Sequence, residues 1–448
     1  MRFPALRAAF ESNEMIVDSF AGGGGASEGI EWALGRPVDV AINHDPEAIE
    51  MHRRNHPGTK HYTQDIWAVD PVEVCRGRRV GALWSSPSCT HFSRAKGSAN
   101  PLSAEIRDLA WVICDWAEKV RPRVIFCENV SEWLTWGPLL ENGRPDKSRA
   151  GEHWRAWVAK LLALGYVVEW RELLAADYGA ATRRKRLYVI ARCDGQPIVW
   201  PEPTHRKSDH IQFHTCVDWS LPMRSIFGRK HSLKPATEQR IAIGIKRFVI
   251  DAPTPFIVRH GHYSNKTGAG LVEGKGAGLF RGQPLDQPLA TICATNDKHL
   301  VLPMLSKHYG GVIGHGVDRP IGTVTAVDHH SLTVASTAGD HADEVAAFLL
   351  RYNRTGVGAD LRSPLPTITT KPRFGLVCVE GRDERIRDIL MRMLAMRELY
   401  RAQGFRDTYQ IDGFTQKTQN RLVGNSVCPH VARAIVAANL LGERAVAA

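Results

Sequence analysis

The chain has 448 residues, of which 43% are hydrophobic and 23% are charged. This length and apolar content are too large for one small domain and allow a sizeable core, which predicts a folded protein of two domains. The formal net charge of +11 is not concentrated in any block of like charges. A positive charge spread over folded surface suits a polyanionic partner, although an ordinary basic enzyme would show the same balance.

The cysteines and the apolar segments exclude several classes of protein. The nine cysteines are odd in number and none form a Cys-x-x-Cys pair, so neither a disulfide framework nor a zinc knuckle is indicated. Residues 1–13 lack an apolar stretch long enough for a signal peptide, and no run approaches the ~20 apolar residues of a membrane span. We therefore expect a reducing, cytoplasmic setting, with no membrane and no metal.

From Glu14 to about Pro203, short apolar runs alternate with stretches of helical periodicity. Strands alternating with helices predict an α/β fold with a doubly wound, mostly parallel sheet. Ligands of such sheets bind beyond the carboxyl ends of the strands, where the candidate site residues should therefore lie. The expected strands are 15–17, 38–42, 80–84, 124–126 and 187–190, and the expected helices are 104–120 and 152–164.

The first predicted strand is followed by a glycine-rich turn, Asp18-Ser19-Phe20-Ala21-Gly22-Gly23-Gly24-Gly25. Four consecutive glycines remove every Cβ, so that a ligand can approach the backbone and the N-terminus of the next helix. The turn lacks the third glycine of a dinucleotide fingerprint, and no phosphate loop is present. On these residues alone it could be a tight connection, a nucleotide loop or a methyl-donor loop.

Polar residues also follow the next two strands, in Asn43-His44-Asp45 and Gln64-Asp65-Ile66. A polar side chain about 20 residues past a glycine-rich turn is where a ribose hydroxyl would be bound, and an Asp one strand further could accept from an adenine amino group. Both could instead cap helices. Asp45 precedes Pro46, an arrangement typical of an N-cap, so we expect Asp45 to cap a helix whatever else it does.

Three further strand ends carry reactive side chains. Cys89 lies where a short apolar strand runs out into a polar turn, which exposes its sulfur and makes it a candidate nucleophile. Glu128 directly follows another apolar strand, and a partly desolvated carboxyl there suits a proton donor. Arg184 and Arg186 alternate at the start of a later strand and so share one face, although a solvated basic edge would look the same. We expect these ends to share one pocket.

Taken together, these stretches resemble the DNA cytosine C5-methyltransferase family. Residues 18–24 look like its methyl-donor motif, Cys89 with Phe92-Ser93 like its nucleophile loop, and Glu128-Asn129-Val130 like its acid motif. Arg184 and Arg186 match its paired arginines, after which the family places a target-recognition region.

Two later segments extend the resemblance in the same order along the chain. Arg397-Glu398 with Ala402-Gln403-Gly404-Phe405 resembles the ninth motif, and we expect a helix there. Gly424-Asn425-Ser426-Val427 resembles the tenth motif, which lies near the cofactor in the family, although Asn425 and Ser426 are also common helix caps. A final helix is expected from Val431 to Leu441.

The resemblance implies a reaction and a cofactor. The Cys89 thiolate would add at C6 of a flipped-out cytosine, so that C5 can take the methyl group of S-adenosylmethionine. Glu128 would hold and protonate N3, and Arg186, supported by Arg184, would favour the charge developing on the ring. Cofactor contacts are implied for Asp18, Phe20, Gly22, Gly24, Asn43, Asp45, Asp65, Ile66, Asn425 and Ser426.

Four positions depart from the family pattern. Ser88 and Thr90 flank Cys89 where the family usually has Pro and Gln. Asn43 stands where the family usually carries Glu for the cofactor ribose, and Thr182 replaces the usual Gln before the arginines. None of these changes removes an atom that the chemistry requires.

The middle of the chain reads differently, with frequent Gly and Pro and little helical periodicity. We expect a catalytic domain over 14–205, a β-rich target-recognition domain over 206–380, and a return to the catalytic domain over 381–448. A weak repeat occurs at 287–292, 319–324 and 363–368. The basic and aromatic patches before each copy suit phosphate or base-edge contacts, or they are solvated loops of a small β-domain.

The sequence therefore predicts a sequence-specific DNA cytosine C5-methyltransferase that acts on double-stranded DNA as a monomer. It would belong to a restriction-modification system with a cognate restriction endonuclease, or be a solitary or prophage enzyme. The alternatives are a transfer-RNA cytosine methyltransferase and a DNA-binding protein that has lost catalysis. The long inserted domain favours DNA over RNA, and intact Cys89, Glu128 and Arg186 argue against lost catalysis.

Overall fold

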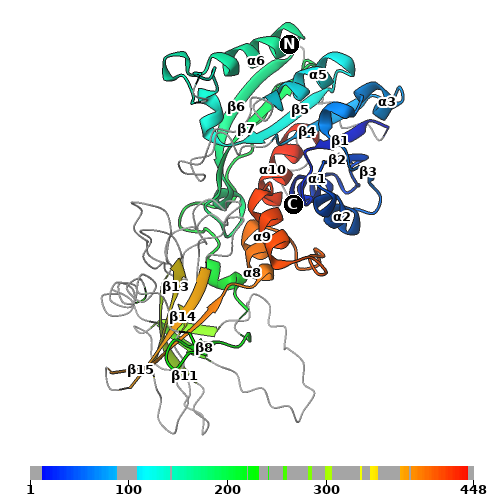
Figure 1. Cartoon of the computed structure of the whole chain (residues 1–448). Coiled ribbons are helices and arrows are strands. Elements are labelled where there is room, and N and C mark those ends of the chain that lie inside the picture. Colours follow the sequence, from blue (N-terminus) through cyan, green and yellow to red (C-terminus); the bar gives the residue numbers. More distant parts are fainter. Residues whose placement is uncertain are drawn as a thin grey trace, which may run out of the picture.

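The computed structural model describes residues 13–87, 108–141, 144–218, 220–231, 241 and 389–441, and the backbone of the strands between residues 256 and 388. These residues form two sheets, one in each half of the molecule (Figure 1). Helices flank the first sheet, and the three C-terminal helices α8, α9 and α10 return to it from the second (Figure 1).

The first sheet has seven strands in the order β3-β2-β1-β4-β5-β7-β6. Its strands β1 to β5 run parallel, while β7 is antiparallel to both of its neighbours. The predicted α/β fold with a doubly wound, mostly parallel sheet is confirmed. The strands are β1 (Met15–Ser19), β2 (Val40–Ile42), β3 (Lys60–Tyr62), β4 (Val80–Ser85), β5 (Val124–Asn129), β6 (Val167–Leu174) and β7 (Lys185–Arg192).

Helices cover both faces of this sheet. On one face, α1 contributes Ile30 and α10 contributes Ile435 to the core. On the other face, α5 contributes Trp116 and α6 contributes Trp157. The expected helix 104–120 is described only as α5, because residues 101–107 lie outside the described part. The helices are α1 (Gly25–Leu34), α2 (Pro46–Asn55), α3 (Pro71–Cys75), α5 (Trp111–Lys119), α6 (Glu152–Ala163) and α10 (Pro429–Leu440), with short 3₁₀ turns at Ile66–Ala68, Ser131–Thr135, Lys147–Arg149, Ala175–Tyr178 and Phe213–Cys216.

The second sheet has eight strands, with the path β10-β9-β11-β13-β14-β15-β8 and β12 paired to β14. It includes β15, so it continues beyond residue 380, whereas the domain limits themselves stay a prediction. The three repeat segments lie outside the described residues. The strands are β8 (Arg224–Ser225), β9 (Phe256–Arg259), β10 (Arg281–Pro284), β11 (Lys298–Met304), β12 (Thr333–Val334), β13 (Glu344–Arg351), β14 (Phe374–Arg382) and β15 (Arg385–Met393).

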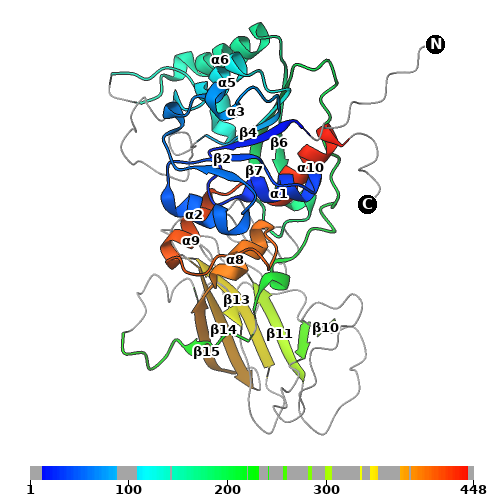
Figure 2. The same ribbon diagram turned by 90° about the vertical axis from the view of Figure 1, so that its right-hand side faces the viewer.

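Two helices lie where the chain returns from the second sheet to the first (Figure 2). They are α8 (Met396–Gln403), which confirms the helix expected near Arg397, and α9 (Gln416–Asn425), which we had not predicted as a helix. The Tyr400 hydroxyl of α8 donates to the carbonyl of Gln419 in α9 at 3.2 Å, which ties the two helices together.

Candidate active site

The strand ends singled out in the sequence meet at one edge of the first sheet. Because β1 to β5 are parallel, the residues that follow them lie at the same edge. Strand β7 runs the opposite way, with Leu187 opposite Asn129, so its first residues reach this edge as well. The topology therefore brings together the glycine-rich turn, Glu128 and the paired arginines.

Glu128 and the two arginines form a buried ion cluster. Oε1 of Glu128 lies 3.2 Å from Nη2 of Arg184 and 3.3 Å from Nε of Arg186. All three side chains are buried, with residue exposures of 6%, 4% and 7%. Arg184 also donates to the carbonyl of Gly424 at 3.1 Å, so the cluster is bound to the end of α9. A solvated basic edge is thereby excluded for both arginines.

The segment after β4 begins beside this cluster. Nδ2 of Asn129, the residue after Glu128, donates to the carbonyl of Pro87 at 3.1 Å, and both residues are buried. Cys89 follows Pro87 by two residues and lies outside the described residues. Asn129 belongs to the segment that resembles the acid motif, and its position directly after the acid is the signal in the sequence for a site residue.

The four glycines of the turn have different surroundings. A Cβ on Gly24 would overlap the Tyr409 hydroxyl and the His56 ring, and one on Gly25 would overlap Ser426 and the carbonyl of Val427. Gly22 has a φ of +54° and open surroundings, because a Cβ added there would lie 3.9 Å from its nearest neighbouring atom, the carbonyl oxygen of Phe20. We expected all four glycines to admit a ligand. Two of them instead admit the C-terminal segment, and Gly22 leaves space.

Asp18, at the end of β1, has a carboxyl group that is satisfied on one side only. Its Oδ2 lies 2.7 Å from the Ser27 hydroxyl, while Oδ1 has no hydrogen-bond partner among the described residues. The residue is 1% exposed. Burial raises the pKa of Asp18 to about 7, against the lowering effect of the hydrogen bond to Ser27. A buried carboxyl oxygen without a partner is costly and favours a cationic or hydrogen-bond-donating ligand.

The polar side chains after β2 accept hydrogen bonds from nearby backbone amides. Asp45 is the N-cap of α2, with Pro46 at the first helical position, as its sequence predicted. Its Oδ1 accepts from the amide of Glu47 at 3.0 Å, and its Oδ2 pairs with Arg421. The Asn43 side-chain oxygen accepts from the Asp45 amide at 2.9 Å. The cofactor contacts expected of Asn43 and Asp45 stay predictions, and both Asp45 oxygens already have partners.

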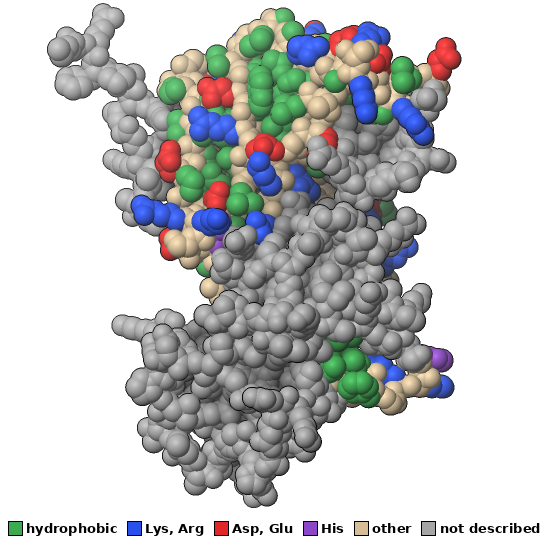
Figure 3. Space-filling view, turned by 90° about the vertical axis from the view of Figure 1, so that its left-hand side faces the viewer, with side chains coloured by type: hydrophobic (Ala, Val, Ile, Leu, Met, Phe, Trp, Pro, Cys, Tyr) green, Lys and Arg blue, Asp and Glu red, His purple; other side chains and the backbone are tan. Residues whose placement is uncertain are grey.

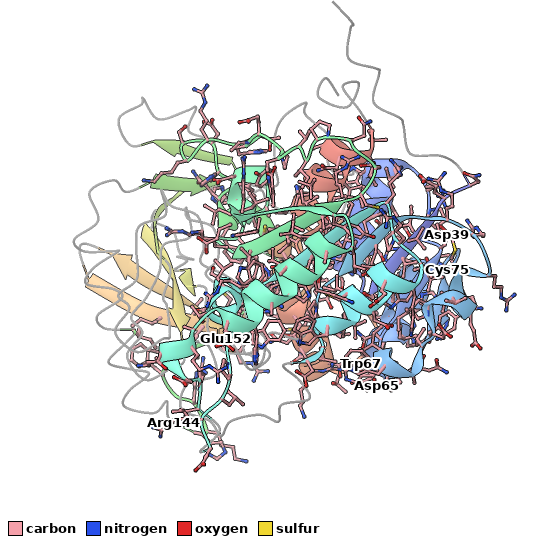
Figure 4. All side chains as sticks on the ribbon, turned by 90° about the horizontal axis from the view of Figure 1, so that it is seen from above. Asp39, Asp65, Trp67, Cys75, Arg144 and Glu152 are labelled. Carbon is pink, nitrogen blue, oxygen red and sulfur yellow. The ribbon has the colours of Figure 1, made fainter. Side chains whose placement is uncertain are left out.

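Asp65 follows β3 and caps a short 3₁₀ turn. Its Oδ1 accepts from the amide of Trp67 at 2.9 Å, and the two side chains lie close together at the surface (Figure 4). Asp65 is exposed, whereas Ile66 beside it is buried. This pair presents a carboxylate next to an apolar side chain, which suits an adenine ring with its amino group.

The tenth-motif residues end α9 and meet the glycine turn. Asn425 is the last residue of the helix and is exposed, and Ser426 is its C-cap. Gln403 of the ninth motif donates to the Ser426 carbonyl at 2.9 Å.

Phe20, in the glycine-rich turn, has a φ of +61°, a left-handed backbone conformation that a residue with a large side chain rarely adopts. Strain of this kind occurs at functional sites, and here it falls within the turn.

Two further residues of the return segment hold the turn and α2. The Tyr409 hydroxyl donates to the Gly23 carbonyl, and Arg421 pairs with Asp45 and with Glu47. Neither residue was predicted, because no local pattern near residue 409 or 421 indicates a partner more than 370 residues earlier. Only the nearness of Arg421 to the tenth motif could have suggested it.

Charge is mixed on the visible surface of the first domain. On the face shown in Figure 3, lysine and arginine side chains are interspersed with aspartate and glutamate. In the part of the chain that the structure describes, no helix is long and apolar enough to cross a membrane.

Comparisons with known proteins point to one family. The family model for C-5 cytosine-specific DNA methylases matches residues 15–242 and 335–440, which is well over half of the chain. The type II methyltransferase M.AgeI of Thalassovita gelatinovora is 28% identical over 197 residues, 42% of each chain. DNA (cytosine-5)-methyltransferase 1B of Oryza sativa subsp. japonica is 24% identical over 474 residues, 95% of this chain and 28% of the relative.

The chain matches only part of the length of these relatives, whereas its fold matches a solved structure over nearly the whole of both chains. The chain spans less than half the length of both relatives. The crystal structure of the Dnmt2 methyltransferase of S. pombe matches with a TM-score of 0.51 and 13% identity, over 95% of this chain and 98% of the other. The order of the motifs, the sheet topology and the family match agree, and the chain belongs to the C-5 cytosine-specific DNA methylase family.

Proposed function

We propose that this protein transfers a methyl group from S-adenosylmethionine to C5 of a cytosine in double-stranded DNA. The observation that carries the proposal is the buried cluster of Glu128, Arg184 and Arg186, at the sheet edge where Asn129 also holds Pro87. An acid, two cations and the start of the Cys89 segment thus lie beside the glycine-rich turn. An ion pair with a purely structural role would not need the Cys89 segment and the glycine-rich turn beside it.

The cofactor would bind along the ends of β1 to β3. S-adenosylmethionine supplies an electrophilic methyl group on a positively charged sulfur, and it also carries an ammonium group. The free Oδ1 of Asp18 and the open space at Gly22 fit a cationic ligand against the turn. Asp65 and Ile66 would hold the adenine. Phe20, Gly24, Asn43, Asp45, Asn425 and Ser426 complete the proposed set.

Cys89 is the proposed nucleophile, and the described cysteines are poor candidates. Burial raises the thiol pKa of Cys75 and of Cys428 to about 11, and it raises that of Cys127, next to Glu128, as well. A thiol with a raised pKa holds little thiolate, which is the attacking form. Cys193 is half-buried and donates to the Pro122 carbonyl at 3.5 Å, away from the strand ends of the site.

The proposed reaction balances on these residues. The Cys89 thiolate forms a bond to C6, Glu128 gives a proton to N3, and the C5–C6 electron pair becomes available at C5. C5 then takes the methyl group, and the electron pair of the broken methyl–sulfur bond stays on the donor sulfur, which leaves as S-adenosylhomocysteine. A base removes the C5 proton, those electrons restore the C5–C6 double bond as the Cys89–C6 bond breaks, and N3 returns its proton to Glu128. Arg186 faces the charge on the ring, and Arg184 holds Glu128 in place. The cytosine must leave the base stack to be reached.

The test is base-resolution methylation sequencing of DNA from a methylation-free host that expresses the protein. We expect 5-methylcytosine at one short sequence, its loss in Cys89→Ala, and its retention in Cys193→Ala, the matched thiol control. S-adenosylmethionine binding by purified Cys89→Ala should stay within a few-fold. Methylated RNA with unmethylated DNA would favour a transfer-RNA enzyme, and DNA binding without any methylation would favour a protein that only holds a base.

We also propose that the enzyme acts as a monomer and that it accompanies a restriction endonuclease. The support for a nuclease is that M.AgeI and M.SacI are named type II methyltransferases. The first proposal is tested by light scattering, which gives the number of protein copies bound to a duplex that contains the recognised site. Resistance of the methylated DNA to a nuclease encoded beside the enzyme measures the second, and the absence of such a nuclease would make it a solitary or prophage enzyme.

A further inference from the structure

Backbone hydrogen bonds shape the glycine-rich turn and leave two amides at its tip. The amide of Ala21 donates to the carbonyl of Ile42 at 3.0 Å, and the amide of Gly24 donates to the carbonyl of Ala21 at 3.0 Å. Gly22 and Gly23 are therefore the central residues of a four-residue turn. In the described part of the chain, the amides of these two glycines have no hydrogen-bond acceptor. The tip of the turn therefore has two backbone donors left for a ligand.

A tyrosine from the return segment holds this tip. Successive glycines have little conformational preference of their own, so other parts of the fold must fix the turn. The Tyr409 hydroxyl, 386 residues further along the chain, donates to the carbonyl of Gly23. This carbonyl and the Gly24 amide belong to one planar peptide group. The peptide group is therefore held on both sides, by Tyr409 at its carbonyl and by Ala21 at its amide.

Tyr409 is itself fixed by its surroundings. It is buried, and its ring packs against Phe405 at a centroid distance of 4.6 Å and against Tyr400 at 6.4 Å. Its backbone carbonyl accepts from the Arg397 side chain of α8 at 2.7 Å. The hydroxyl therefore reaches the turn on a side chain that is anchored to α8 at both its ring and its backbone.

His56, the C-cap residue of α2, contacts the same hydroxyl. Its Nε2 lies 3.4 Å from the Tyr409 oxygen, and its Nδ1 lies 3.0 Å from Oε2 of Glu31 in α1. The His56 ring is fully buried, and its centroid lies 4.4 Å from that of His52, whose Nε2 lies 2.9 Å from Ser27 Oγ. Side chains of α1 and α2 therefore set the position of His56 beside the Tyr409 hydroxyl.

We propose that Tyr409 is a positioning residue for the methyl donor, whose hydroxyl, held by His56, fixes the Gly23–Gly24 peptide group in the conformation that binds the cofactor. This inference rests on the proposed function, because it needs S-adenosylmethionine at the glycine-rich turn. A turn that is already ordered loses less conformational entropy on binding, which raises the affinity. In this scheme Tyr409 touches no reacting atom, so it acts on cofactor affinity and leaves the chemical step unchanged.

The test compares Tyr409→Phe with Tyr400→Phe. Each substitution keeps the ring and removes a buried hydroxyl that donates to a backbone carbonyl, on Gly23 in the first case and on Gln419 in the second. Calorimetry of the full chain measures the Kd for S-adenosylmethionine, and incorporation of labelled methyl groups into DNA from a methylation-free host measures KM and kcat. We expect Tyr409→Phe to raise Kd and KM about fivefold and to keep kcat within about twofold. Tyr400→Phe should leave Kd and KM unchanged.

A double-mutant cycle tests the role of His56. His56→Leu removes both ring nitrogens and should raise Kd about threefold, because the Tyr409 hydroxyl loses one of its two partners. If His56 acts through that hydroxyl, the same substitution should change the Kd of Tyr409→Phe by less than about twofold. A full further loss of affinity in the double variant would contradict the link between His56 and Tyr409.

The outcomes separate this inference from the proposed function. If wild-type protein binds S-adenosylmethionine and Tyr409→Phe binds it equally well, the inference alone is overturned, and an equal loss of affinity in Tyr400→Phe has the same meaning. A fall in kcat at unchanged KM would also refute it, because the hydroxyl would then act in the chemical step. No binding by wild-type protein would remove the proposed cofactor and the inference with it. If Tyr409→Phe does not fold, the Kd and KM of His56→Leu decide.

Discussion

Glu398 binds both segments that connect the first domain with the second sheet. We expect its loss to destabilise this connection severely. Its carboxylate accepts from Arg392 at 2.7 and 2.9 Å, where the chain returns from β15. It also accepts from the amide of Asp218 at 2.8 Å, where the chain leaves, and from the amide of Ala395 at 2.7 Å. Glu398 is 0% exposed.

The substitution Glu398→Gln keeps the volume and removes the charge. It takes the carboxylate charge away from the Arg392 guanidinium, whose side chain is 10% exposed, and turns an amide donor toward groups that also donate. Breaking a buried ion pair by removing one partner costs about 3–5 kcal/mol. For a domain of ordinary size, that cost lowers the thermal midpoint by roughly 6–20 °C.

The matched control lies beside the same helix. Asp407 pairs with Arg401 at 2.6 Å, and its side chain is 64% exposed. Asp407→Asn makes the same change of carboxylate to amide, and an exposed pair contributes less than about 1 kcal/mol. Differential scanning calorimetry of both variants measures the contrast. If Glu398→Gln melts within about 2 °C of Asp407→Asn, the junction does not depend on this carboxylate.

Two further substitutions test the proposed cofactor site, each against a control of the same kind. Gly24→Ala should lower cofactor affinity and stability together, because its Cβ would meet Tyr409 and His56, whereas Gly35→Ala, with a similar positive φ but open surroundings, should cost only about 1 kcal/mol of strain in thermal melts. Asp65→Ala should weaken S-adenosylmethionine about tenfold in calorimetry, while Asp70→Ala, which removes an equivalent cap, should not; equal affinities would remove Asp65 from the site.

Much of the fold could be predicted from the sequence because most strands of the first sheet are buried on both faces. Strands β1, β4 and β5 are buried throughout, which requires the continuous apolar runs that the sequence shows. Strand β6 was missed, because it is an edge strand whose residues are mostly exposed. Charged residues interrupt its apolar residues, such as Val167 and Trp170, so the segment has no continuous apolar run.

The candidate site was predictable only where one short segment carries it. Asp45 and Pro46 announce a helix cap by their order alone, and the cap is present. The pairing of Glu128 with Arg184 needed the antiparallel register of β5 and β7, which no local pattern contains. The Ser27–His52 contact likewise joins residues 25 positions apart on different helices.

The contacts between the N-terminal and C-terminal parts of the first domain explain how the region proposed for target recognition can be an insertion. The glycine turn is completed by Tyr409 and Ser426, and the Glu128 cluster by the carbonyl of Gly424. The proposed cofactor site therefore needs the segment after β15 to dock on the first sheet. Since Glu398 holds both crossings at one point, the sequence between them can change without moving the ends that build the site. We infer that target choice can vary in the inserted part while the residues proposed for methyl transfer keep their geometry.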